Sequence, residues 1–123
     1  MGRIFQAPQG EVFLGKLTSA NLNSTADQVI TLLSGTKRLT RILMVNPSAT
    51  PSLAAGGFYS AASKGGNALV SSAQVYTALT AMLGLNPTLA GNYITGTTLY
   101  LSLTTANGSA CTADIYVFGE ILP

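Results

Sequence analysis

Apolar and polar residues alternate most regularly near the end of the chain, over residues 97–122. One side of the first limb carries Leu99, Leu101 and Leu103, and its other side carries Thr98, Tyr100, Ser102 and Thr104. The second limb alternates in the same way from Cys111 onward. Between the limbs lies Asn107-Gly108, and both residue types tolerate the positive φ of a tight reversal. The pattern predicts two half-buried strands that pair as a hairpin.

The polar sides of these two limbs also carry aromatic rings, at Tyr100, Tyr116 and Phe118. An antiparallel sheet that covers a core with one face usually presents polar side chains on the other. Large rings on that second face need another surface to cover them. We therefore expect Tyr100, Tyr116 and Phe118 to share an outward face and to lie in an oligomer interface.

Shorter apolar runs predict further strands upstream at residues 17–22, 27–33 and 37–46. Residues 58–62 and 68–70 are expected to pair through a turn with two adjacent glycines. Residues 72–81 have features of both helix and strand, and the β-forming run Val75-Tyr76-Thr77 favours a strand. The total is seven to nine short strands with frequent turn signals. This is typical of an all-β antiparallel sandwich or barrel.

The first fifteen residues contain two small apolar pairs broken by Pro8, Gly10 and Gly15. The pattern is too interrupted for a strand or helix that stands alone. Residues 1–15 are therefore predicted to be an extended N-terminal arm, and residues 16–123 a single domain. Such an arm either frays or becomes ordered on another protein.

Charged residues are scarce, at 8% of the 123 residues, against about 25% in an ordinary globular chain. Between Ile42 and Ala113 the sole charged residue is Lys64. A long neutral stretch favours a surface that is covered in an assembly. No apolar run approaches the ~20 residues of a membrane-spanning helix. The net charge of +2 is too small to indicate nucleic acid or a membrane as partner.

The residues that usually carry catalysis are few. The absence of histidine removes Ser-His-Asp and Cys-His arrangements. Cys111 has no neighbouring cation in sequence and is predicted to be a buried structural thiol, in a chain suited to synthesis in a reducing compartment. Asp114 and Glu120 are six residues apart on one strand, about 20 Å, which is too far for a direct acid–base pair. We therefore expect no enzyme activity, no cofactor and no metal site within the subunit.

Lys37, Arg38 and Arg41 form the sole basic cluster. Phosphate or RNA binding is one interpretation, but three charges without interleaved aromatics make a weak electrostatic footprint. The favoured interpretation is a solvated strand end, or an ion pair with an acidic residue of a neighbouring subunit.

Four segments carry a resemblance: the Asn46-Pro47-Ser48 turn, residues 55–59 (AGGFY), residues 63–66 (SKGG) and residues 114–119 (DIYVFG). With these, residues 39–122 resemble small proteins encoded in the structural-gene regions of tailed bacteriophages, similar in kind to virion proteins that decorate or cement the capsid. The resemblance implies a jelly-roll-like β-sandwich that forms a homotrimer. It would sit on the outer capsid surface and bridge neighbouring copies of the major capsid protein.

On this basis the expected function is capsid decoration, by a protein made in the host cytoplasm and located on the virion. Within the arm, Arg3, Ile4 and Phe5 are the expected capsid-binding residues. Two alternatives remain open. One is a head-fibre base, neck or tail component. The other is a virion-surface carbohydrate-binding module with Tyr59, Tyr76 or Tyr93 as sugar platforms.

Overall fold

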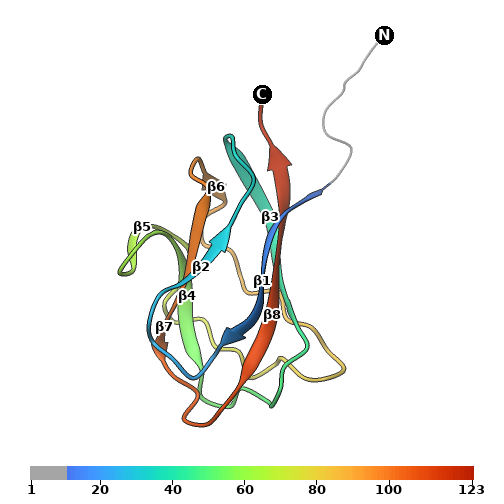
Figure 1. Ribbon diagram of the computed structural model, residues 1–123, viewed down its shortest axis with the longest axis vertical. Coiled ribbons are helices and arrows are strands. Elements are labelled where there is room, and N and C mark those ends of the chain that lie inside the picture. Colours follow the sequence, from blue (N-terminus) through green and yellow to red (C-terminus); the bar gives the residue numbers. More distant parts are fainter. Residues whose placement is uncertain (1–10) are drawn as a thin grey trace.

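The computed structural model describes residues 11–123, and all regular structure in that range is strand (Figure 1). The eight strands are β1 (Val12–Asn21), β2 (Gln28–Thr31), β3 (Lys37–Val45), β4 (Ala55–Ala61), β5 (Gly65–Val70), β6 (Tyr93–Ile94), β7 (Thr98–Thr105) and β8 (Thr112–Ile121). They form two four-stranded antiparallel sheets, in the orders β1-β8-β3-β6 and β2-β7-β4-β5. The predicted all-β antiparallel class is confirmed, and the number of strands lies within the expected seven to nine.

The two limbs at the end of the chain are strands as predicted, but they do not pair with each other. β7 lies between β2 and β4, whereas β8 lies between β1 and β3 in the other sheet. The connecting residues 106–111 cross from one sheet to the other. Asn107 stabilises this connection with two hydrogen bonds. Its N–H donates to Leu22 O at 2.9 Å, and its side-chain Oδ1 accepts from Leu53 N at 3.1 Å. The predicted hairpin is therefore wrong, since alternation reports which side of a strand is buried and not which strand lies beside it.

β1 is longer at its start than the sequence predicts. It begins at Val12, so residues 12–15 belong to a sheet and the predicted boundary of the arm at residue 15 is wrong. The pairing with β8 has a β-bulge between Phe13 and Gly15. A bulge changes the side to which the following residues point. Leu14 and Gly15 are both buried, while Phe13 and Lys16 on either side of them are exposed, so the alternation is interrupted at this point. The expected capsid-binding residues Arg3, Ile4 and Phe5 lie outside the described residues.

Residues 71–92 connect β5 to β6 and are irregular, so the predicted strand at residues 72–81 is wrong. Single bridges attach this segment to three strands, at Ala55 with Val75, Met44 with Leu85, and Val70 with Leu89. Its largest anchor is Tyr76, which is fully buried and donates its hydroxyl hydrogen to Gly56 O at 2.8 Å. The segment is thus held by a few buried side chains and bridges instead of by a continuous ladder.

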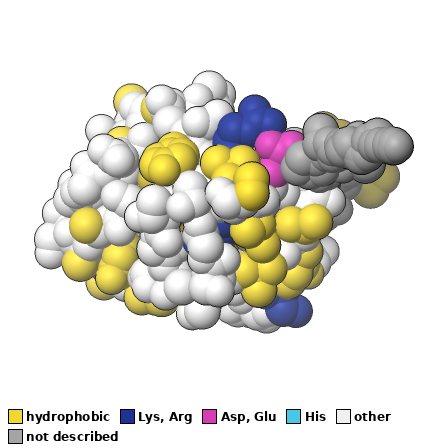
Figure 2. Space-filling model, turned by 90° about the horizontal axis from the view of Figure 1, so that it is seen from above, with side chains coloured by type: hydrophobic (Ala, Val, Ile, Leu, Met, Phe, Trp, Pro, Cys, Tyr) yellow, Lys and Arg dark blue, Asp and Glu magenta, His cyan; other side chains and the backbone are white. Residues whose placement is uncertain are grey.

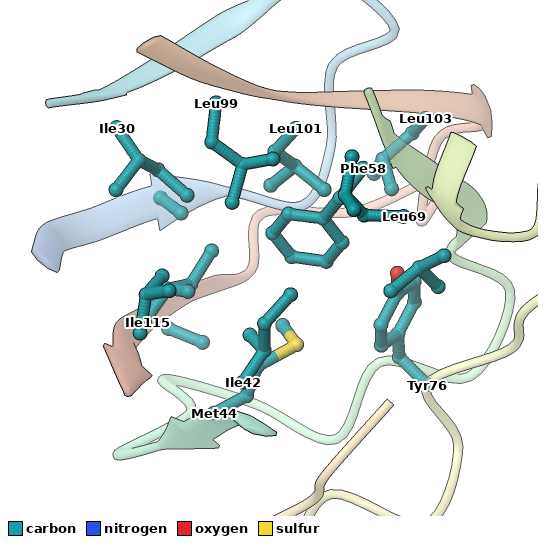
Figure 3. Packing of buried hydrophobic residues seen from close by; sticks show 14 of the residues in the cluster. Ile30, Ile42, Met44, Phe58, Leu69, Tyr76, Leu99, Leu101, Leu103 and Ile115 are labelled. Carbon is teal, nitrogen blue, oxygen red and sulfur yellow. The ribbon is translucent and has the colours of Figure 1, made fainter. Parts of the chain in front are cut away.

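One hydrophobic core lies between the inner faces of the two sheets (Figure 3). Leu99, Leu101 and Leu103 reach it from β7, as their alternation predicted, and Ile115 and Val117 reach it from β8. The ring of Phe58 on β4 lies between these layers, with Ile42 of β3 below it in the view of Figure 3. Each of these side chains is essentially inaccessible to solvent. At about 1.5–3 kcal/mol for each fully buried large apolar side chain, this core supplies most of the driving force for folding.

The predicted β4–β5 hairpin is confirmed, but the two glycines begin β5 and residues 62–64 make the turn. Polar side chains stabilise this turn. Ser63 and Lys64 have φ values of 59° and 58°, a conformation that non-glycine residues adopt infrequently. The carboxylate of Asp27 accepts the Ser63 N–H at 2.7 Å. The ammonium of Lys64 donates to the buried Ser102 hydroxyl at 2.9 Å, so the turn is fastened to the outer side of β7.

Candidate interaction surface

An aromatic cluster lies on the outer face of the sheet that contains β1, β8 and β3. Its members are Phe13 of β1 and Tyr116 and Phe118 of β8, hereafter the aromatic face. The Phe13 ring centroid lies 6.1 Å from that of Phe118, edge to face, and 6.4 Å from that of Tyr116. Phe13 is 48% exposed, and the other two rings are half-buried. Edge-to-face pairs at such distances stabilise the cluster while leaving ring surface open to a partner.

The strand register explains how these rings come together. Phe13 is directly opposite Phe118 across β1 and β8, and Lys16 is opposite Tyr116. β8 alternates regularly: Ala113, Ile115, Val117 and Gly119 are buried, and Tyr116 and Phe118 lie between them on the outer side. The alternation of β8 therefore predicts Tyr116 and Phe118 on this face, whereas Phe13 lies in the segment that the sequence predicts to be an arm. The bulge that turns Phe13 outward has no signal in the local alternation.

Paired charges border the aromatic face. The Arg41 guanidinium lies 4.2 Å from the centroid of the Phe118 ring, a cation–π distance, and its Nε donates to Glu11 Oε1 at 2.9 Å. Arg38 forms an ion pair with Glu120 on the adjacent strand. Figure 2, a view of the end at which β8 finishes, shows hydrophobic side chains directly beside adjoining basic and acidic ones. These two arginines are paired within the subunit, and the exposed Lys16 ammonium lies 5.9 Å from the centroid of the Tyr116 ring. A partner here therefore meets ring surface, two ion pairs and one lysine.

Tyr100 does not belong to this cluster. It lies on β7 in the other sheet, opposite Val29 of β2 and Tyr59 of β4. Its side chain is half-buried. The expectation that Tyr100, Tyr116 and Phe118 share one face is therefore wrong, because it depended on a hairpin between β7 and β8 that does not form.

The predicted basic cluster is separated by the fold. Lys37 is fully buried at the start of β3, where its ammonium donates to Gly35 O, and burial lowers the pKa of that ammonium. Arg38 is exposed, and Arg41 is half-buried against Phe118. The expectation that the charged start of β3 is solvated therefore fails for Lys37. The ion pairs of Arg38 and Arg41 are made within the chain, to Glu120 and Glu11.

The structure also places the residues that were considered for catalysis, metal binding and sugar binding. Cys111 is buried, as predicted, with its Sγ 3.1 Å from Ala49 O. Within residues 11–123 there is no group of three or more His, Cys, Asp or Glu that could hold a metal ion. Tyr59 and Tyr76 are buried, which rules them out as sugar platforms, whereas Tyr93 is 56% exposed. The part of the chain that the structure describes has no helix long and apolar enough to cross a membrane.

Asp114 lies beside the aromatic face and accepts hydrogen bonds from two residues that have a positive φ. Its Oδ1 accepts from Ser19 N at 2.9 Å, and its Oδ2 accepts from Asn46 Nδ2 at 3.0 Å. Ser19 and Asn46 both have a φ of 56°. These two hydrogen bonds, that from Asn46 first, lower the pKa of Asp114 below its ordinary value of 3.8. The ionised carboxylate thus links a β-bulge in β1 to the end of β3.

This linkage predicts acid-dependent stability. A carboxyl group whose folded pKa lies below its unfolded value stabilises the fold fully above the unfolded pKa and loses that contribution as pH falls through the folded pKa. We therefore expect Asp114→Asn to have a lower free energy of unfolding than the unsubstituted protein at about pH 7, and this difference should become smaller below about pH 4. Urea unfolding of both proteins at about pH 7 and at about pH 3 measures the difference at each pH. The same difference at both pH values would contradict the role of the ionised carboxylate.

Comparison of the chain with protein-family models, with curated protein sequences and with solved structures gives no match.

Proposed function

We propose that this chain is a structural protein of the tailed-phage virion that decorates the outer capsid surface and stabilises it by bridging copies of the major capsid protein. The observation that carries the proposal is the aromatic face, in which Phe13, Tyr116 and Phe118 offer ring surface at the centre and ion-paired arginines at the border. Aromatic residues and arginine are the types enriched at the centres of protein interfaces. The low charge of the chain and its resemblance to decoration proteins support the same function.

We further infer a jelly-roll-like sandwich. The antiparallel pairs include β1 with β8, β2 with β7, β3 with β6, and β4 with β5. The first four strands therefore pair with the last four in reverse order, like one long folded ribbon. The additional pairs β3–β8 and β4–β7 wrap this ribbon into two sheets. This winding supports a jelly roll, an architecture used by viral capsid domains and lectins, although a fold by itself assigns no function.

In this proposal the chain acts as a homotrimer. A three-fold ring needs a heterologous interface, in which one patch of a subunit meets a different patch of the next, and the rotation must close. The aromatic face supplies one such patch. Each trimer then adds contacts with several capsid subunits, so that separating those subunits requires breaking the added contacts as well.

Disrupting the aromatic face is expected to abolish assembly. The double variant Phe13→Ser and Phe118→Ser removes two rings, and loss of a hot spot of about 2 kcal/mol or more weakens association about thirtyfold or more. Sedimentation equilibrium gives the mass of the protein in solution, and co-sedimentation with capsids that lack it gives binding. We expect the unsubstituted protein to sediment as a trimer and with capsids, and the double variant to do neither.

Tyr100→Ser is the matched control, because it removes an aromatic ring from the outer side of the other sheet. Circular dichroism establishes that both variants remain folded. Unchanged mass and capsid binding for the double variant would refute the proposed role of the aromatic face. Cryo-microscopy of the virion distinguishes capsid decoration from a place in the neck, tail or head-fibre base.

A further inference from the structure

A small polar pocket lies where β6 of one sheet approaches the β4–β5 hairpin of the other. Its lining residues are Ser60, Asn67, Tyr93, Ile94, Thr95 and Gly96, and its volume is about 270 Å³. None of the residues of the aromatic face lines it. The pocket therefore needs an explanation separate from assembly.

The pocket combines one open aromatic ring with neutral hydrogen-bonding groups. Tyr93 is 56% exposed, while its neighbour Ile94 is buried and anchors the strand. Ser60 and Thr95 add hydroxyl groups, and the exposed Asn67 adds a carboxamide with two donors and an acceptor. No charged side chain lines the pocket. An exposed ring in an uncharged, hydroxyl- and amide-lined pocket matches a ligand with an apolar C–H face and neutral hydroxyl groups at its edge.

The backbone holds these groups in fixed positions. β6 pairs with β3, with Tyr93 opposite Arg38 and Ile94 opposite Lys37. On the other side, the Asn67 N–H donates to the Ser60 Oγ at 2.8 Å, which positions the hydroxyl group and leaves its own hydrogen available to donate. At Gly96 no heavy atom lies within 4 Å of the position that a Cβ would take, so the backbone there leaves an opening. A site formed before binding loses less entropy when a ligand arrives.

The surrounding charges favour a neutral ligand over an anion. Arg38 is the charged residue opposite Tyr93 in the register, and its guanidinium is already ion-paired with Glu120. Lys37, opposite Ile94, has its ammonium directed to Gly35 O and is buried. A phosphate or carboxylate ligand would find no free cation from either residue.

We propose that this pocket binds one neutral pyranose residue of a glycan, with the sugar C–H face against the Tyr93 ring and its hydroxyl groups at Asn67, Ser60 and Thr95. An aromatic ring provides the apolar platform, and the amide and hydroxyl groups fix the orientation of the sugar. The proposal does not depend on capsid decoration. It assigns a second, separate surface to the chain.

The test is a chemical-shift titration of the full chain with the methyl glycosides of glucose, galactose and mannose and with N-acetylglucosamine. At least one of them is expected to give saturable shifts confined to the pocket residues. Tyr93→Ala should weaken that binding at least about tenfold, Asn67→Ala should also weaken it, and Tyr93→Phe, which keeps the ring, should stay within about threefold. Thr88→Ala, an exposed change outside the pocket, is the control and should have no effect.

Absence of saturable shifts with all four sugars at about 50 mM would overturn the proposal, and so would full binding by Tyr93→Ala. Because Tyr93 is exposed, its substitution is expected to leave the fold intact, and Asn67→Ala gives a second measurement through a different group. Capsid co-sedimentation of Tyr93→Ala should match that of the unsubstituted protein. A failed sugar titration would therefore refute only the proposed sugar pocket, and failed capsid binding would refute only the proposed capsid decoration.

Discussion

Replacing Tyr76 with alanine is expected to lower the free energy of unfolding by about 3–5 kcal/mol, the range for removing a buried aromatic ring. Tyr76 is fully buried in the core, and its ring is the main anchor of the irregular residues 71–92 (Figure 3). Its loss leaves a cavity and releases that segment from β4. Urea unfolding measures the change. Limited proteolysis should show earlier cleavage within residues 71–92 than in the unsubstituted protein.

Tyr76→Phe separates the ring from its hydroxyl. The hydroxyl donates to Gly56 O, and burial raises the pKa of Tyr76, so the donor stays protonated at any ordinary pH. The phenylalanine variant keeps the packing and leaves one buried carbonyl without that donor, at a cost of about 1–3 kcal/mol. Equal losses for the two variants would mean that the hydrogen bond, and not the ring, holds the segment.

The second large effect is expected at Gly119, near the end of β8, where that strand lies between β1 and β3. A Cβ at this position would lie 2.3 Å from Arg38 O, 2.9 Å from Leu14 Cδ1 and 3.0 Å from Leu39 Cα. The closest contact is with the backbone of a paired strand, which cannot rotate away as a side chain can. Gly119→Ala should therefore lower the free energy of unfolding by about 3 kcal/mol or more, at the upper end of the range for overpacking.

Gly96→Ala is the control for this prediction, because the same added methyl group meets no heavy atom within 4 Å. Its unfolding free energy should stay within about 0.5 kcal/mol of that of the unsubstituted protein. Thermal or urea unfolding of the two variants side by side gives the comparison. A Gly119→Ala variant as stable as Gly96→Ala would show that β3 and β8 can separate there without loss.

The packing around Gly119 also connects stability to the aromatic face. Gly119 follows Phe118 and precedes Glu120, and it lies opposite Val12 of β1 and Leu39 of β3. Its missing side chain lets three strands approach closely at that level. The same close approach brings Phe13 and Arg41 to the Phe118 ring from the two neighbouring strands.

The sequence by itself determined the class of fold and part of the core. Period-two alternation identified the buried sides of β7 and β8, and the break between residues 62 and 68 identified the β4–β5 hairpin. Alternation is a property of each strand and its solvent exposure, so it can be read locally. It also placed Tyr116 and Phe118 on an outer face and Cys111 inside.

Only the tertiary structure decided which strands are neighbours, because pairing depends on contacts between residues far apart in sequence. It placed Tyr100 and Phe118 on different sheets, although only residues 106–111 connect their strands. It brought Phe13 to Phe118 through a β-bulge, and Tyr93 to Asn67 across the edge between the sheets. It also buried Lys37, whose charge predicted exposure. Both candidate surfaces of this protein are built from such long-range neighbours, which explains why sequence patterns identified their residues only in part.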